Sequence, residues 1–294
     1  MKLKSTLLGA VAALALTSSA FAAVVTPPGE RAGIDLASPL PEGVYFVDLA
    51  GVGNNRGSVT PSSAFDYNVP IIAWATPWTI LGGRIQLLVA APEASVSFGQ
   101  NNLLARGIYN PFVAGQIAFN LGNGFSASYL AGAYIAVDSP NNTGPLAGAW
   151  NQTTFHQQLA LAYHGGGWNA TANLMYGIVG NNNTSGLQNS NYFNYDLGLT
   201  HTFGKWEVGV IAYGSVNGQI NGYYHNAVYQ PYTAGNSMFA VGGLIGYNFG
   251  PVIMQFSLST DVASNYPSKA TFAGLHVIIP IWNPEEPKAV VAKY

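Results

Sequence analysis

Two neighbouring stretches of the chain, residues 168–179 and 192–203, alternate apolar and polar residues almost without fault. A two-residue period is the signature of a β-strand with one apolar face. Soluble proteins mostly use strands of about five or six residues, whereas a tilted strand of about ten residues crosses a bilayer. The alternation therefore predicts an all-β fold, a transmembrane antiparallel β-barrel.

The overall composition agrees with this interpretation. Of all residues, 49% are hydrophobic and only 7% are charged, whereas about a quarter are charged in an average soluble domain. Beyond the N-terminal residues no apolar run is long enough for a membrane-spanning helix, which needs about 18 residues or more. A barrel explains both observations, because lipid solvates one face of every strand.

The first residues predict export from a bacterial cytoplasm. Lys2 and Lys4 precede an apolar stretch, and Ala20-Phe21-Ala22 forms a small-x-small cleavage site, so residues 1–22 are interpreted as a signal peptide. Residues 23–42 are rich in proline and lack any period. We expect them to form an irregular segment, either in the periplasm or in the barrel mouth. The predicted location is the outer membrane of a Gram-negative bacterium.

Twelve candidate strands follow, and the connections between them alternate between long and short. Outer-membrane barrels have this asymmetry, with short periplasmic turns and long external loops. The barrel is expected over residues 43–282, with a C-terminal tail over 283–294. The predicted strands are 43–50, 66–76, 81–96, 108–121, 125–136, 153–164, 168–179, 192–203, 206–216, 237–249, 252–263 and 270–282.

The polar faces of these strands define a candidate lumen that is nearly uncharged. Channels for ions usually line the passage with rings of charge, so this lining suits neutral or aromatic solutes better. Asp196 is a lone acid in the middle of its strand and needs a hydrogen-bonding partner there. The candidate substrate-binding residues are His156, Gln158, His164, Asn173, Asn194, Asp196 and Gln255.

Several other kinds of chemistry find no support. The chain has no cysteine, and His156 and His164 lie on one strand face about 26 Å apart at about 3.3 Å per residue, so they cannot share a metal. The motifs of common enzymes and nucleotide-binding sites are absent. Without the signal's two lysines, eight basic residues face twelve acids, and the net charge of −4 argues against nucleic acid as a partner. We expect neither enzymatic activity nor a cofactor.

The sequence leaves three alternatives open. One is a non-conducting outer-membrane barrel whose long loops bind a surface partner or serve adhesion. Another is an outer-membrane enzyme that modifies lipid, with His156 and one of Ser126, Ser128 or Ser257 as the candidate pair. The last is a secreted soluble β-protein. The oligomeric state is not determined by the sequence.

Three segments carry a resemblance to a known family. They are Pro39–Phe46 at the first strand, the run from Ser190–Asp196 through Trp206–Gly214 to Asn217–Gln219, and Gly274–Trp282 at the last strand. Over most of residues 39–282 the chain resembles the outer-membrane family named for the meta-pathway of phenol degradation, whose members are regarded as transporters. The resemblance implies passive uptake of small hydrophobic or aromatic compounds, with membrane lipid and such a solute as partners. Asp196 and Gln219 stand where that family tends to have an acid and a glutamine.

Overall fold

A computed structural model describes residues 26–57, 63–98, 103–137, 151–183, 189–219, 223–225, 228–230, 234–265 and 268–284. The predicted signal peptide and the last ten residues of the predicted tail lie outside the described residues. Within the described part of the chain, no helix has the length and apolarity needed to cross a membrane.

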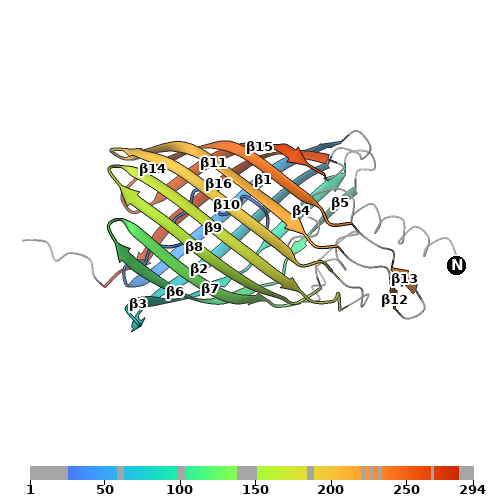
Figure 1. Ribbon diagram of the computed structural model, residues 1–294, viewed down its shortest axis with the longest axis horizontal. Coiled ribbons are helices and arrows are strands. Elements are labelled where there is room, and N and C mark those ends of the chain that lie inside the picture. The colour runs from blue at the N-terminus through green and yellow to red at the C-terminus, as the bar shows by residue number, and fades with distance from the viewer. Residues whose placement is uncertain are drawn as a thin grey trace, which may run out of the picture.

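The strands form a closed antiparallel barrel (Figure 1). β1 pairs with β16 on one side and with β2 on the other, and this double pairing closes a ring of 12 strands. The prediction of a twelve-stranded antiparallel barrel is confirmed. In ring order the strands are β1 (Gly43–Gly57), β16 (Ser268–Trp282), β15 (Ile253–Ser264), β14 (Ser237–Asn248), β11 (Trp206–Asn217), β10 (Tyr192–Phe203), β9 (Trp168–Val179), β8 (Thr154–Gly165), β7 (Phe125–Tyr134), β6 (Phe112–Gly122), β3 (Gly83–Ala90) and β2 (Ser63–Ile80).

Two predicted strands are interrupted in the structure. The segment 81–96 divides at Ala91-Pro92 into β3 and β4 (Glu93–Phe98), and the segment 108–121 begins in β5 (Leu103–Ile108) and continues after Pro111 as β6. Proline has no N–H for the strand ladder and is therefore found at such breaks. β4 pairs with the N-terminal part of β2, Ser63–Asn68, and with β5. β12 (Tyr223–His225) and β13 (Val228–Gln230) form a separate hairpin.

The connections separate the barrel into a turn end and a loop end. At the turn end, tight turns such as Leu81-Gly82 and Gly122-Asn123-Gly124 use positive φ angles, which favour hairpins with the right-handed twist of the strands. β1 begins and β16 ends at this same end. Longer connections follow β7, β9 and β11 at the opposite end. The structure therefore has the arrangement of periplasmic turns and external loops that the connection lengths predict.

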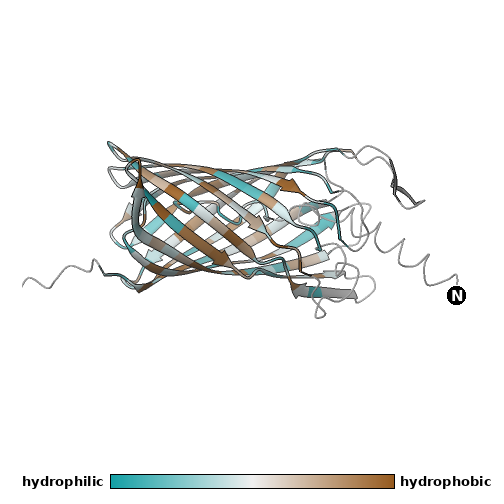
Figure 2. Ribbon diagram, turned by 90° about the horizontal axis from the view of Figure 1, so that it is seen from below, coloured by the Kyte–Doolittle hydropathy of each residue, from teal (hydrophilic) through white to brown (hydrophobic). Residues whose placement is uncertain are grey.

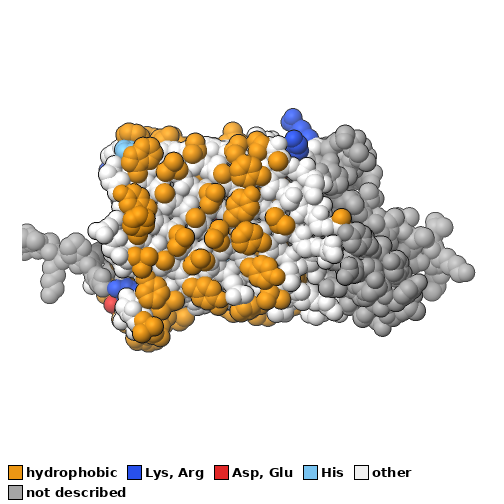
Figure 3. Space-filling view, in the orientation of Figure 1, with side chains coloured by type: hydrophobic (Ala, Val, Ile, Leu, Met, Phe, Trp, Pro, Cys, Tyr) orange, Lys and Arg blue, Asp and Glu red, His pale blue; other side chains and the backbone are white. Residues whose placement is uncertain are grey.

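The outer surface of the barrel is an apolar belt. Along each strand, exposed hydrophobic residues alternate with buried residues, and hydrophobic and hydrophilic positions follow one another along the ribbons (Figure 2). The hydrophobic side chains spread over the barrel surface, with Lys and Arg side chains near its ends (Figure 3). Large aromatic side chains, among them Trp168, Phe203, Trp206 and Trp282, are about half exposed at the turn end. A belt of this kind is solvated by lipid and not by water, as in transmembrane barrels of the outer-membrane type.

Residues 26–42, which we call the plug segment, run through the barrel lumen (Figure 1). At the loop end, the Thr26 hydroxyl lies 3.0 Å from the Tyr134 hydroxyl. At the turn end, Asp35 lies 2.7 Å from His164, the penultimate residue of β8. Between them the chain makes successive tight turns, in which Glu30, Ala32 and Ile34 donate backbone hydrogen bonds to residues three positions earlier. The plug segment therefore passes along the lumen before it enters β1.

Candidate functional site

Asp196 is the central anchor of the plug segment. Its two carboxylate oxygens accept hydrogen bonds from the backbone N–H groups of Gly29 and Arg31, each at 2.9 Å. The residue is fully buried at the inner face of β10. Hydrogen bonds between a carboxylate and backbone N–H groups are roughly twice as strong as neutral ones. The partner that the sequence required for Asp196 is therefore the backbone of the plug segment.

Side-chain amides of the same wall bind the carbonyl groups of the plug segment. Asn194 donates to the carbonyl of Thr26 at 2.7 Å, and Asn173 donates to those of Arg31 and Ile34. Gln255, on β15, lies 3.4 Å from the carbonyl of Gly33. The irregular backbone of the plug has few partners of its own, and a buried carbonyl without one costs free energy. The polar lumen residues meet this need.

Arg31 lies in a fully enclosed polar cluster. Its guanidinium donates to the Gln158 side chain, lies 3.4 Å from His156 Nε2 and is 3.6 Å from the Glu30 carboxylate. The other ring nitrogen of His156 contacts the Tyr192 hydroxyl at 3.1 Å. Both nitrogens of His156 are thus occupied, and the serine partner considered from the sequence is not among its contacts. The Ser–His pair that the sequence left open as an alternative is thus not formed at His156 in this structure.

The turn end of the plug segment is fixed by Asp35. Its carboxylate accepts backbone hydrogen bonds from Ala37 and Ser38 and contacts His164 Nε2. Burial of Asp35 opposes its ionisation, but the hydrogen bonds from Ser38, His164 and Ala37 outweigh it and hold the pKa of this carboxyl below its usual value. Both side chains remain partly exposed. This contact is a rim interaction, unlike the buried contacts of Asp196.

The plug segment also packs closely against the wall formed by β10, β11 and β14. Gly29 and Gly33 have φ angles of +85° and +84°, a conformation that side chains other than glycine rarely adopt. A Cβ atom at Gly29 would lie 2.7 Å from the ring of Tyr213, and one at Gly33 would meet the side chain of Leu244. We call β8, β9, β10, β11, β14 and β15 the anchoring wall.

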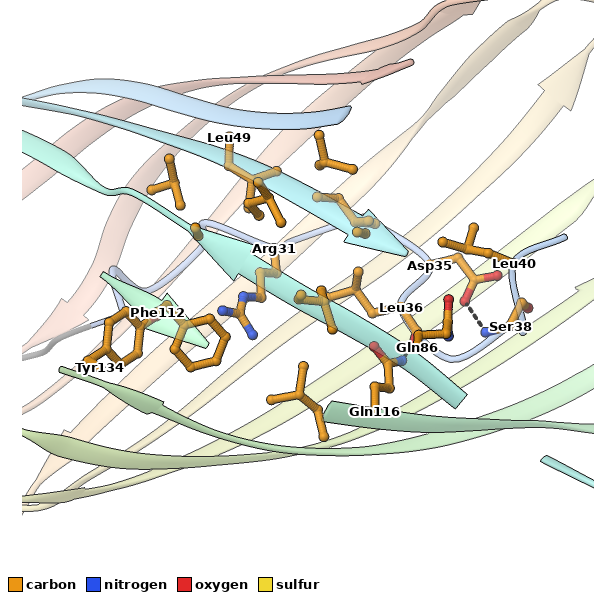
Figure 4. A pocket seen from close by; sticks show the side chains of 18 residues that line it. Arg31, Asp35, Leu36, Ser38, Leu40, Leu49, Gln86, Phe112, Gln116 and Tyr134 are labelled. Atoms are coloured by element: carbon orange, nitrogen blue, oxygen red, sulfur yellow. Dashed lines mark hydrogen bonds between the residues drawn. The ribbon is translucent and has the colours of Figure 1, made fainter. Parts of the chain in front are cut away.

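On the other side of the plug segment the lumen contains an apolar cavity of about 80 Å³. Its wall consists of β1, β2, β3, β6 and β7, which we call the cavity wall. Figure 4 shows Arg31, Phe112 and Tyr134 around one end and Gln86 and Gln116 near the other. The middle of the cavity is formed by apolar side chains that point inward, namely Val47, Leu49, Val69, Ile71, Ala73, Leu88, Ala90 and Leu130.

All seven residues predicted to bind substrate contribute to the polar interior, but none of them lines this cavity. Six hydrogen-bond the plug segment, through its backbone or through Arg31 and Asp35, and His156 lies beside Arg31 at 3.4 Å. Whether any of them also contacts a solute stays a prediction. Sequence reasoning missed the apolar cavity residues, because it assigned apolar strand faces to lipid. A signal was available in β3, where the outward-facing Leu87 and the inward-facing Leu88 are both apolar.

The described residues contain no group of three or more His, Cys, Asp or Glu side chains that could hold a metal ion. The only charged side chains at the cavity, Arg31 and Asp35, already have partners within the protein. The geometry of the site is therefore that of an apolar space between the cavity wall and a docked polypeptide segment.

A family model described as "Putative MetA-pathway of phenol degradation" matches residues 50–277. The chain belongs to this family. The matched range begins inside β1 and ends inside β16, so the family's shared part is the barrel and the plug segment precedes it. The resemblance stated from the sequence is confirmed. Among curated proteins, none matches the chain in sequence.

Barrels similar to this one occur among solved structures of outer-membrane proteins. The chain is similar to the COG4313 outer membrane channel from Pseudomonas putida F1, with a TM-score of 0.65 and 10% identity over 83% of this chain and 97% of that chain. It is also similar to the translocator domain of the autotransporter NalP from Neisseria meningitidis, with a TM-score of 0.49 and 10% identity over 83% and 90% of the two chains. For the CymD monoaromatic hydrocarbon channel the TM-score is 0.43 and the identity is 9%, over 82% of this chain and 89% of that chain. At these identities the likeness to the first structure shows the fold.

Proposed function

We propose that this protein is an outer-membrane channel for passive uptake of small hydrophobic or aromatic compounds, and that the structure represents its closed state. The observation that carries the proposal is the apolar cavity between the plug segment and the cavity wall. A lumen that served only ions or sugars would gain nothing from an inward apolar face. An apolar solute, by contrast, gains about 25 cal/mol for each Å² of apolar surface removed from water.

The small volume of the cavity is our reason for assigning the structure to a closed state. A cavity that holds benzene has a volume of about 150 Å³, and the cavity here has about 80 Å³. An aromatic ring therefore needs additional space, and the side of the cavity best able to supply it is the plug segment. The barrel wall is fixed by continuous strand pairing, whereas the plug is held by a limited set of side-chain contacts. Passage thus requires the plug segment to shift.

The proposal also draws on the family. Its description refers to phenol degradation, and the solved structure with the same fold is a channel. A channel needs no catalytic group, which agrees with the occupied ring nitrogens of His156. The second candidate function is a non-conducting barrel whose loops bind a partner. The observation that favours it is the docked plug segment itself.

A reversible cross-link distinguishes these two functions. Ala37 of the plug segment and Ala160 of β8 are fully buried in one cluster, and the chain has no native cysteine. The double variant Ala37→Cys with Ala160→Cys can therefore be locked by oxidation and released by reduction. Intact Gram-negative cells that express it are given radiolabelled toluene, and initial uptake is measured before and after reduction. Each single variant serves as the control for oxidation itself.

We expect the oxidised double variant to lose toluene uptake and the reduced form to regain it, while the single variants stay active throughout. Equal uptake by the oxidised and reduced forms would show that the plug segment does not gate the passage. No uptake above cells without the protein, from a folded barrel in either redox state, would favour the non-conducting function.

A further inference from the structure

At the end of the cavity away from Arg31 and Tyr134, two glutamines from neighbouring strands line the wall. Gln86 of β3 and Gln116 of β6 stand directly opposite each other in the strand register. Both point into the lumen and both line the cavity (Figure 4). Only 3% of Gln86 is exposed to solvent. Two amide side chains thus face the cavity from the barrel wall at this end, where Asp35 and Ser38 of the plug segment also line it.

The two amides differ in what they bind within the protein. Gln116 donates a hydrogen bond of 2.6 Å to the carbonyl of Leu36 in the plug segment, which leaves its oxygen available. Among the described residues, the Gln86 side chain makes no hydrogen bond. Its amide atoms are not among the fully buried side-chain atoms that lack a partner, so the amide faces the cavity space, where a polar group that loses water without gaining a partner costs about 1–3 kcal/mol. The partner that Gln86 lacks within the chain can therefore be supplied from the cavity.

From this arrangement we propose that Gln86, together with the Gln116 oxygen, recognises a neutral hydroxyl group on an otherwise apolar solute. The inference rests on the proposed uptake function and specifies its solute class. A hydroxyl is both a donor and an acceptor, and an amide complements both roles. Once the plug segment has shifted to make room, the ring of the solute lies against Leu49, Val69 and Leu88, with its hydroxyl directed toward the turn end. A phenol is therefore a better ligand than a hydrocarbon of the same size.

The charged side chains near the cavity argue against solutes that carry an ionised group. Asp35 borders the same end as Gln86, and a solute carboxylate placed there would face this acid and be repelled. A solute ammonium would find the Asp35 carboxylate already satisfied by Ala37, Ser38 and His164. Burying a charge without a partner is far more costly than burying a hydroxyl. The site is thus selective for a neutral polar group.

The test compares two solutes that differ in a single group. The purified barrel in detergent micelles is titrated with 4-fluorophenol and with 4-fluorotoluene, and binding is followed by fluorine NMR against micelles alone. The variant Gln86→Met keeps the length of the side chain and removes the amide. The matched control is Gln157→Met, because Gln157 lies on the outer face of β8 and bonds the outer Tyr129 hydroxyl. Folding of each variant is checked by heat-modified migration on gels, and Gln86→Leu is the second variant.

In the wild-type protein we expect 4-fluorophenol to bind more tightly than 4-fluorotoluene after correction for micelle partitioning. Gln86→Met should weaken phenol binding about five- to tenfold, which is the loss of one hydrogen bond, and should leave toluene binding unchanged or tighter. Gln157→Met should bind both as the wild type does.

Two outcomes would overturn the inference, and they have different meanings. If both solutes bind the folded barrel and Gln86→Met leaves their ratio unchanged, hydroxyl recognition is wrong while the uptake function stands. If neither solute binds the folded wild-type barrel above the micelle blank, the cavity is not a solute site, and the proposed function fails together with the inference.

Discussion

The two sides of the lumen solve different physical problems. The anchoring wall presents Asp196, Asn173 and Asn194, whose polar atoms bind an irregular backbone that has few partners of its own. The cavity wall presents Leu49, Val69 and similar side chains, which leave an apolar space along the same plug segment. The anchoring wall satisfies backbone hydrogen bonds, whereas the cavity wall offers transfer free energy to an apolar molecule.

This division lets one lumen hold a plug and a solute at the same time. If all the inward faces were polar, the plug segment would be held from every side and no apolar solute would gain by entering. If all were apolar, the plug's carbonyl and N–H groups would be left without partners. The cavity wall also makes a few polar contacts with the plug segment, since Gln116 and Ser128 both donate a hydrogen bond to the carbonyl of Leu36. They keep the plug close enough for the cavity to be narrow.

The largest effect should come from removing the central anchor. Asp196→Ala leaves the N–H groups of Gly29 and Arg31 without their carboxylate, which should weaken docking of the plug by about 3 kcal/mol, roughly 100-fold. Hydrogen exchange of residues 26–42 should accelerate, and single-channel conductance in planar bilayers should rise. Asp261→Ala is the matched control, because Asp261 accepts a hydrogen bond from Ala270 on the neighbouring strand and makes no described contact with the plug. Equal exchange in both variants would refute the anchoring role of Asp196.

Filling the cavity should have a smaller and more selective effect. Leu88→Trp adds an indole to the cavity wall, and we expect toluene uptake to fall about tenfold because the solute's space is occupied, at a packing cost of about 1–3 kcal/mol. Exchange of the plug segment should change little. Leu87→Trp adds the same group to the lipid-facing side of the same strand, where 40% of Leu87 is exposed, and should leave uptake at the wild-type level. A similar loss in both variants would argue against solute binding in the cavity.

The contact between His164 and Asp35 at the turn end should contribute least to docking of the plug segment. His164→Ala removes a contact of 2.7 Å to Asp35, but both side chains are partly exposed, and exposed pairs contribute about 0–1 kcal/mol. Because the pKa of Asp35 is lowered, its carboxylate stabilises docking at neutral pH, and this contribution is lost as the pH falls through the lowered pKa. Protection of residues 35–38 against hydrogen exchange, taken relative to the intrinsic exchange rate at each pH, should therefore decrease on acidification in the wild type and respond less in Asp35→Asn. An effect as large as that of Asp196→Ala would contradict the distinction between rim and centre.

The sequence alone determined the barrel, because its information is local. A two-residue period shows which face of a strand is apolar, and a low charged fraction shows that this face meets lipid. The alternation of long and short connections then gives the strand number and the two ends. Asp196 could also be recognised as a residue in need of a partner, since it is an acid placed in the middle of an amphipathic strand.

Only the tertiary structure decided what that partner is and where the solute space lies. The contacts of Asp196 with Gly29 and Arg31 join residues more than 160 positions apart, and no local period records such a pairing. The cavity wall was hidden for a related reason. Inward and outward residues of β3 such as Leu87 and Leu88 are both apolar, so alternation there could not distinguish a face toward lipid from a face toward a cavity. Closure of the barrel around the plug segment creates that difference, because it turns one apolar face away from the membrane.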